Sequence, residues 1–251
     1  MNVTLVLAAV VPALLLLVRV YLADRLEREP LSLLLGLIFW GVVATELAAL
    51  SEQAGIFLLK RLIPQVQSGG WSFGWGTVAY ATTQYSTLYD ILLYFVVVAV
   101  SEEGIKYLIL RFRTWRSPEF NCTFDGVVYA VFLSLGFALW ENIHYVLAYG
   151  MGTAVARAVT AVPGHACFGV FMGTWYGLAK RASLAGKPGK SLFFRLLAFL
   201  IPTLLHGLYD FAAASQLQEL GWLFLPFIGA MFLVSYFLVR LMSRFDKYMR
   251  G

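Results

Sequence analysis

The chain has 251 residues, of which 60% are hydrophobic and only 13% are charged. Soluble domains contain about 45–50% apolar and about 25% charged residues, so this composition excludes an ordinary soluble protein. The net charge is +5, and the positive residues lie mainly between long apolar runs. This placement is typical of charge that faces anionic lipid rather than nucleic acid. We therefore expect membrane lipid, and no nucleic acid, as a partner.

About seven apolar runs are long enough to cross a bilayer, which takes about 20 helical residues. The sequence thus predicts an all-α, polytopic transmembrane helical bundle of about seven membrane helices, with residues 1–251 forming a single integral membrane domain. The first run lacks a basic leader and a small-residue cleavage site, so we expect it to be retained. The predicted spans are 2–23, 31–58, 86–112, 123–149, 153–180, 191–214 and 219–242.

Segment 59–85 differs from the apolar runs. It contains Gly69-Gly70-Trp71 and Gly74-Trp75-Gly76 together with several polar residues. Tryptophan favours the headgroup level of a membrane. We interpret the segment as an extracytoplasmic loop or an interfacial segment, and the sequence assigns it no function.

Lysine and arginine are concentrated after the first, third, fifth and seventh spans. Positively charged loops are retained on the cytoplasmic side. The pattern therefore predicts a multi-pass protein of the cell membrane with its N-terminus outside and its C-terminus in the cytoplasm. Lys60 and Arg61 are the exception on the other side.

The third span contains two adjacent acids, Glu102 and Glu103, followed by Lys106. Ionisable residues in hydrocarbon are expensive unless they are paired or face a cavity. Lys106 is four and three residues away, so it can reach either acid on one helix face but neutralise only one charge. The other acid then suits a general base or acid, and a structural ion pair is the alternative.

Glu141 in the fourth span shares a helix face with the small residues Ser134 and Ala138, which predicts that it points inward. His144 follows at Glu-x-x-His spacing, but di-iron bundles use two such pairs and this chain has one. We therefore interpret His144 as an outer-interface residue. At 1.5 Å per residue, the predicted spans put Glu141 about 10–15 Å from Glu103 along the membrane normal, and a shifted span boundary, a tilt or a kink has to close this gap.

His165 in the fifth span lies on a stripe of small residues that recur every four positions. Such stripes mark close contact between membrane helices, so His165 points into the bundle. Its functional role and a simple hydrogen bond to a neighbouring helix are both open. The stripe consists of Ala161, His165, Gly169, Gly173 and Gly177.

His206 and Asp210 in the sixth span are four residues apart and therefore lie on one face. They are either two ligands, an imidazole oriented by a carboxylate, or a plain hydrogen-bonded pair. Acids and histidines on the inward faces of four consecutive spans suit water activation, with or without a metal. They also suit proton or cation transport. We interpret the two cysteines, Cys122 and Cys167, as structural.

An ordered set of short motifs resembles the PrsW family of bacterial membrane proteases, which is grouped with type II CAAX prenyl endopeptidases and the scaffold subunit of gamma-secretase. Order and approximate spacing agree from about residue 20 to 211. The matching stretches are Tyr21–Asp24 with Glu29-Pro30, Glu102-Glu103-x-x-Lys106, Phe124–Tyr129, Ser134–Phe137 with Glu141-Asn142, His165 with Gly169–Gly173, and Leu205–Phe211.

The resemblance implies an intramembrane endopeptidase that cleaves single-span membrane proteins similar to anti-sigma factors. It implies that Glu102 and Glu103 supply the base that activates water. Glu141, His165 and His206 would be ligands of a catalytic metal, with zinc expected, or would position the water. His206 with Asp210 would alternatively polarise the scissile carbonyl.

Three positions depart from the CAAX peptidases: Lys106, Glu141 and Asp210 stand where those enzymes keep other residues or spacing. Prenylated C-termini are therefore not expected as substrates. Two other functions stay open from the sequence. One is a catalytically inert membrane scaffold, which has little reason to keep unneutralised acids in lipid. The other is a proton-coupled transporter, which inverted repeats would favour, and the sequence shows none.

Overall fold

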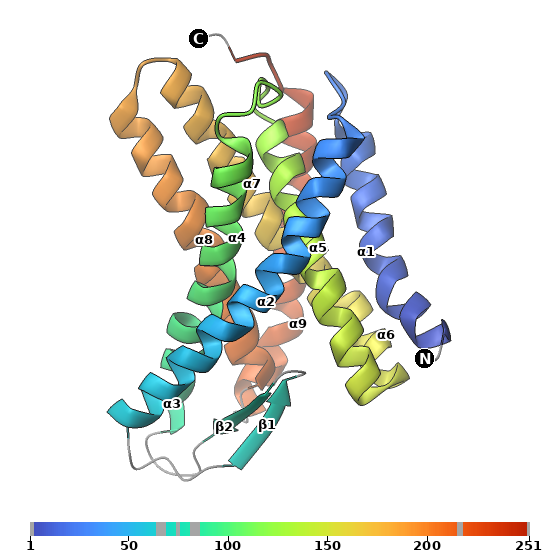
Figure 1. The fold of residues 1–251 in the computed structure, drawn as a ribbon, viewed down its shortest axis with the longest axis vertical. Coiled ribbons are helices and arrows are strands. Elements are labelled where there is room, and N and C mark those ends of the chain that lie inside the picture. Colours follow the sequence, from blue (N-terminus) through green and yellow to red (C-terminus); the bar gives the residue numbers. More distant parts are fainter. Residues whose placement is uncertain (1–2, 64–68, 74–75, 81–85, 215–217, 250–251) are drawn as a thin grey trace.

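The computed structural model describes residues 3–63, 69–73, 76–80, 86–214 and 218–249. It is a bundle of long helices with a small β-hairpin at one end (Figure 1), and it confirms the predicted fold class. The elements in chain order are α1 Val3–Ala23, α2 Leu31–Leu62, β1 Gly69–Phe73, β2 Gly76–Tyr80, α3 Ser86–Ile91, the π-helix η1 Leu92–Val98, α4 Ala99–Thr114, α5 Asp125–Tyr149, α6 Met151–Val159, α7 Ala161–Leu184, α8 Pro188–Ala214 and α9 Gln218–Arg244.

Six helical segments within the described residues are long and apolar enough to cross a membrane. The third predicted span, 86–112, is not among them, because it is divided into α3, η1 and α4 and carries several charges. The fifth predicted span, 153–180, is also not one helix. The backbone of Thr160, with φ −121° and ψ −73°, leaves the helical region and separates α6 from α7.

The segment predicted as a loop or interfacial segment, 59–85, contains more regular structure than expected. Helix α2 continues past its predicted end to Leu62. Strands β1 and β2 then pair antiparallel, with Gly69 opposite Tyr80 and Phe73 opposite Gly76. Residues 64–68, 74–75 and 81–85 of the predicted segment lie outside the described residues.

Helix α5 is the centre of the bundle, and its first fourteen residues are all buried. It packs against α2, α7 and α1. The contact with α2 is so close that a Cβ atom on Gly136 would overlap the backbone of Ile38, and one on Gly41 would overlap that of Leu133. Such backbone-to-backbone packing is how membrane helices associate without a hydrophobic driving force.

The predicted small-residue face of α7 is confirmed as a helix contact. A Cβ atom on Gly169, Gly173 or Gly177 would meet the backbone of Val131, Val127 or Thr123 in and just before α5. His165 lies on the same stripe and is 4% exposed. The stripe therefore fixes how far His165 reaches toward the middle of the bundle.

The outer surface is apolar, as expected for a chain in contact with lipid. In the most hydrophobic windows of α1 and α9, only 22% and 17% of the residues are buried inside the protein. Large side chains such as Phe112 and Trp222 are 86% and 79% exposed. The chain is thus a multi-pass membrane protein.

Candidate active site

A cavity of about 90 Å³ lies within the bundle and is lined by residues of α2, η1, α4, α5, α6, α7 and α8. The 90 Å³ is the space open to the centre of a water-sized sphere. One water needs about 10–15 Å³ of that space, so the cavity has room for several waters. Five of the six predicted catalytic residues line it: Glu102, Glu141, His165, His206 and Asp210. The sixth, Glu103, lies behind the lining.

Glu102 and Glu103 on α4 both contact Lys106. The Nζ atom of Lys106 lies 3.0 Å from Oε2 of Glu102 and 2.8 Å from Oε1 of Glu103. Glu103 and Lys106 are fully buried, whereas Glu102 is 7% exposed and reaches the cavity. One ammonium thus bridges both acids rather than choosing between them, and one negative charge of the pair remains.

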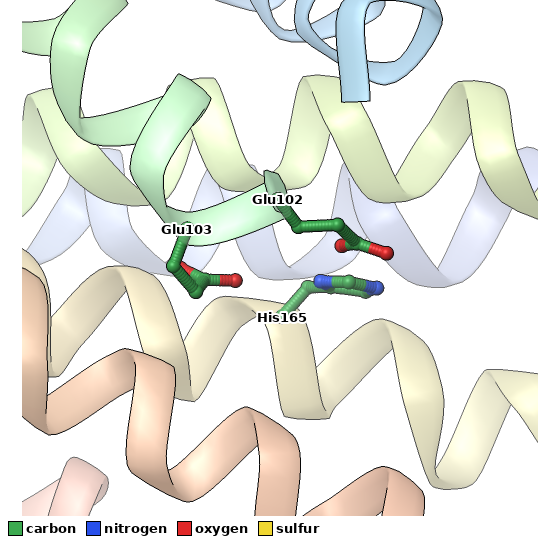
Figure 2. A group of neighbouring side chains, drawn as sticks. All are labelled: Glu102, Glu103 and His165. Carbon is green, nitrogen blue, oxygen red and sulfur yellow. The ribbon is translucent and has the colours of Figure 1, made fainter. Parts of the chain in front are cut away.

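His165 on α7 points at the same place as the two acids, as Figure 2 shows. Its Nδ1 atom lies 3.3 Å from Nζ of Lys106, and its Nε2 atom lies 2.9 Å from Oε2 of Glu141. Because an ammonium only donates, Nδ1 accepts and Nε2–H donates to Glu141, which assigns the tautomer. His165 therefore closes the gap between Glu141 and the acids of α4.

Arg157 on α6 holds the other side of Glu141, and sequence reasoning missed it. Its guanidinium donates to Oε2 of Glu141 and to Oδ1 of Asn142, both at 2.8 Å. Asn142 in turn donates to the carbonyl of Ala9 at 2.8 Å. The sequence did indicate that Arg157 has a partner, because it lies inside the predicted fifth span, where an unpaired cation is unfavourable.

His206 on α8 lies between two carboxylates. Its Nδ1 atom is 2.9 Å from Oε1 of Glu103, and its Nε2 atom is 3.3 Å from Oδ2 of Asp210. With both carboxylates ionised, both hydrogen bonds form at once only when the ring carries two protons. The ring of Phe168 stacks on His206 with centroids 4.7 Å apart and fixes its plane. The predicted contact between His206 and Asp210 is confirmed.

Two further residues line the cavity without having been assigned to it from the sequence. Glu52 reaches the cavity from α2. The sequence could have indicated this position, because an acid inside the predicted second span is unfavourable unless it faces a cavity or a partner. His144 also lines the cavity, with Nδ1 2.9 Å from the carbonyl of Trp140. Our interpretation of His144 as an outer-interface residue did not anticipate this position.

A metal ion requires several ligand atoms that converge on one point. The ligand atoms of Glu102, Glu103 and His165 all lie within 4.8 Å of one another. This trio shares His165 with the predicted ligand set of Glu141, His165 and His206 and differs in the other two. One imidazole and two carboxylates are donors that suit zinc. The ammonium of Lys106 lies among the same three groups, so a metal ion bound by all of them requires Lys106 to move.

Comparison with known proteins places the chain in a family. The sequence profile described as PrsW family intramembrane metalloprotease matches residues 29–241. The chain belongs to this family. Protease PrsW of Geobacillus kaustophilus is 34% identical over 213 residues, which are 85% of this chain and 81% of that protein. Protease PrsW of Shouchella clausii is 30% identical over 97% of this chain and 99% of its own.

A third relative, Protease PrsW of Bacillus subtilis, is 29% identical over 88% of this chain and 87% of its own. No solved structure matches the chain. The protein is an intramembrane protease of the PrsW family, and the cavity with its acids and histidines is the part of the described structure that fits hydrolysis inside a membrane.

Proposed function

We propose that Glu102 activates the water that cleaves a peptide bond of a single-span membrane protein similar to an anti-sigma factor. The observation that carries this assignment is the different placement of the two acids of α4. Glu102 lines the cavity, whereas Glu103 is fully buried behind it and is bonded to Lys106 and His206. Glu103 is therefore a positioning residue, and Glu102 is the acid that can meet water.

In this proposal Glu102 takes a proton from water while the water oxygen attacks the scissile carbonyl carbon. The same carboxyl then returns the proton to the departing nitrogen as the carbon–nitrogen bond breaks. Arg157 and His206 line the cavity. Arg157 has further N–H donors for the negative charge that develops on the carbonyl oxygen, and the protonated ring of His206 adds positive charge nearby. No covalent intermediate with the enzyme is formed.

We further propose zinc as the metal, with His165 as its nitrogen ligand, because both the predicted and the converging ligand sets contain this residue. Five acids lie at the site, but only three cationic groups do, namely Lys106, Arg157 and a protonated His206. This excess of negative charge supports a bound cation. The five acids are Glu52, Glu102, Glu103, Glu141 and Asp210. A zinc ion would supply Lewis-acid polarisation of the scissile carbonyl.

We propose that the protein lies in the cell membrane with the hairpin end outside. The C-terminal ends of α1, α4, α7 and α9 lie at the opposite end of the bundle (Figure 1). The lysines and arginines that follow these helices support a cytoplasmic location for this end. The N-terminus would then be outside and the C-terminus in the cytoplasm.

Cleavage of single-span membrane substrates by the purified protein tests the assignment. We expect Glu102→Gln to lower kcat by about 10²–10⁴-fold, the usual contribution of a general base. Glu103→Gln and His206→Ala should also lower cleavage. Glu46→Gln is the matched control, because Glu46 is an exposed acid of α2 outside the cavity lining. Equal cleavage by wild type and Glu102→Gln would refute the proposal.

Metal analysis tests the zinc assignment separately. We expect about one zinc per chain in wild-type protein and a clear loss in His165→Ala, together with inhibition by a chelator and recovery on adding zinc. Glu46→Gln should keep its zinc. A wild-type protein that cleaves fully after exhaustive chelation, with no metal detected, would show that the water is activated without a metal.

A further inference from the structure

A second group of buried acids lies outside the proteolytic cavity, at the end of the bundle opposite the hairpin, where α1 is joined to α2 and α5 begins (Figure 1). Asp24 and Glu29 are in the connection between α1 and α2, and Asp125 is the first residue of α5. They are 3%, 4% and 1% exposed. One carboxylate oxygen of each lies within 4.8 Å of the others. All three are in stretches that carry the family resemblance, and none lines the cavity.

The hydrogen bonds of this group leave one member without a partner. Oδ2 of Asp125 accepts from the backbone N–H groups of Cys122 at 2.6 Å and Asn121 at 3.0 Å. Glu29 accepts from the hydroxyl of Tyr129 at 2.6 Å. Neither oxygen of Asp24 has a hydrogen-bond partner of ordinary geometry within the described residues, although both are buried.

No ion pair neutralises these acids in the described part of the chain. No lysine, arginine or histidine nitrogen there lies within 4.0 Å of Asp24, Glu29 or Asp125. Burial, together with the negative charges of Asp246 and Glu27, raises the pKa of Asp24 to about 6. The more distant charge of Arg28 and the N–H of Glu29 lower this pKa only in part. Buried carboxylates without a cation are strongly unfavourable.

The C-terminal segment adds a fourth acid. Oδ1 of Asp246 accepts from the backbone N–H of Phe124 at 2.9 Å, while Oδ2 is buried without a partner within the described residues. Ligand atoms of Asp246, Asp125 and Cys122 lie within 4.8 Å of one another. Asp125 therefore lies close to both Asp24 and Asp246, and each of these two acids has a buried oxygen without a hydrogen-bond partner within the described residues.

We propose that Asp24, Glu29 and Asp125 bind a hard divalent cation such as Mg²⁺ or Ca²⁺, with Asp246 as a further oxygen donor. The donor set consists of carboxylate oxygens, which these cations prefer and which zinc structural sites seldom use alone. The cation connects the α1–α2 connection, the start of α5 and the C-terminal segment. The site shares no residue with the proteolytic centre and does not depend on its mechanism.

The test uses the full-length protein in detergent after chelation, with Mn²⁺ as a spectroscopic probe and Mg²⁺ and Ca²⁺ as competitors. We expect Asp24→Asn and Glu29→Gln each to lower Mn²⁺ affinity by more than about tenfold and to abolish the rise in Tm that Mn²⁺ gives in wild type. Glu46→Gln, an exposed acid of α2 outside this group, should behave as wild type. The double variant Glu103→Gln/His165→Ala should keep this Mn²⁺ site.

Three results would overturn the proposal. The first is equal Mn²⁺ binding by wild type and Asp24→Asn, accompanied by an unchanged or higher Tm of the variant, as expected if the carboxyl groups hold protons instead. The second is loss of all Mn²⁺ binding in the double variant, which would assign the binding to the proteolytic centre. The third is the absence of Mn²⁺ binding by wild type. The second and third results do not require the Asp24 variant to fold.

Discussion

Lys106 is the cation that both acids of α4 and His165 contact. It is fully buried, and its ammonium contacts Glu102, Glu103 and His165 while lying 3.8 Å from the centre of the Phe137 ring. Removing one partner of a buried ion pair is strongly destabilising because it leaves an uncompensated charge. Here one substitution would remove the ammonium that two carboxylates share.

We therefore expect Lys106→Met to lower the free energy of unfolding by about 3–5 kcal/mol. Methionine has a similar volume, so the loss would reflect charge rather than a cavity. Thermal unfolding in detergent measures the effect, and Lys187→Met at an exposed position is the control. A Lys106→Met protein as stable as wild type would show that the two acids are already neutral.

Arg157 and Glu141 make a prediction about activity at the same scale. Arg157→Gln removes the guanidinium that holds Glu141 and Asn142, so His165 loses the fixed partner of its Nε2 atom. We expect kcat to fall by about tenfold or more, with partial recovery in Arg157→Lys. Initial rates on a single-span substrate measure this. The idea fails if Arg157→Gln and wild type have equal kcat.

The helices themselves were largely predictable, and their interruptions were not. Long apolar runs fix where spans lie, and the four-residue spacing of Gly169, Gly173 and Gly177 identified the face of α7 that contacts α5. The break at Thr160 and the π-helix Leu92–Val98 leave no mark on hydropathy, because apolar residues continue through both. These interruptions turn neighbouring side chains, and π-helical turns are frequent near functional sites.

The contact between α5 and α7 gives a prediction at the scale of the element. A Cβ atom on Gly173 would overlap the backbone of Gly126 and Val127, which are parts of α5 and have no flexible end to yield. We expect Gly173→Ala to lower the free energy of unfolding by about 1–3 kcal/mol. Gly229→Ala is the matched control in α9, where no atom lies within 4 Å of the added carbon. Equal Tm values of the two variants would contradict the described packing.

At the scale of the whole molecule, the sequence predicted well which polar residues lie close together. It predicted less well which hydrogen bonds and ion pairs they form. Acids and histidines on four spans were expected to meet at one cavity, and four of the five, Glu102, Glu141, His165 and His206, line it. Glu103, the fifth, lies behind the lining, and Asp210 joins the lining instead. The participation of Arg157 and Glu52 was missed. The position of Arg157 depends on the direction that α6 takes after Gly150, and no periodicity within a single span encodes that direction.

Membrane orientation is also a property of the whole chain, and it can be measured directly. We expect a C-terminal epitope tag to be protected from protease added to bacterial spheroplasts, and an N-terminal tag to be cleaved, because the basic loops are retained inside. Permeabilised cells, in which both tags are accessible, are the control. The reverse pattern would place the hairpin in the cytoplasm and refute the proposed orientation.

The bonds around Lys106 form one unbroken chain from Arg157 on α6 through Glu141, His165, Lys106, Glu103 and His206 to Asp210 on α8. Residues that share such a network show interaction energies in double-mutant cycles, whereas distant independent residues add. Substitutions at the two ends, which do not touch each other, should therefore be energetically coupled. The network joins five helices, α4, α5, α6, α7 and α8, which elsewhere are held together mainly by apolar packing. A change of charge on any one of them would therefore affect the stability of the other four.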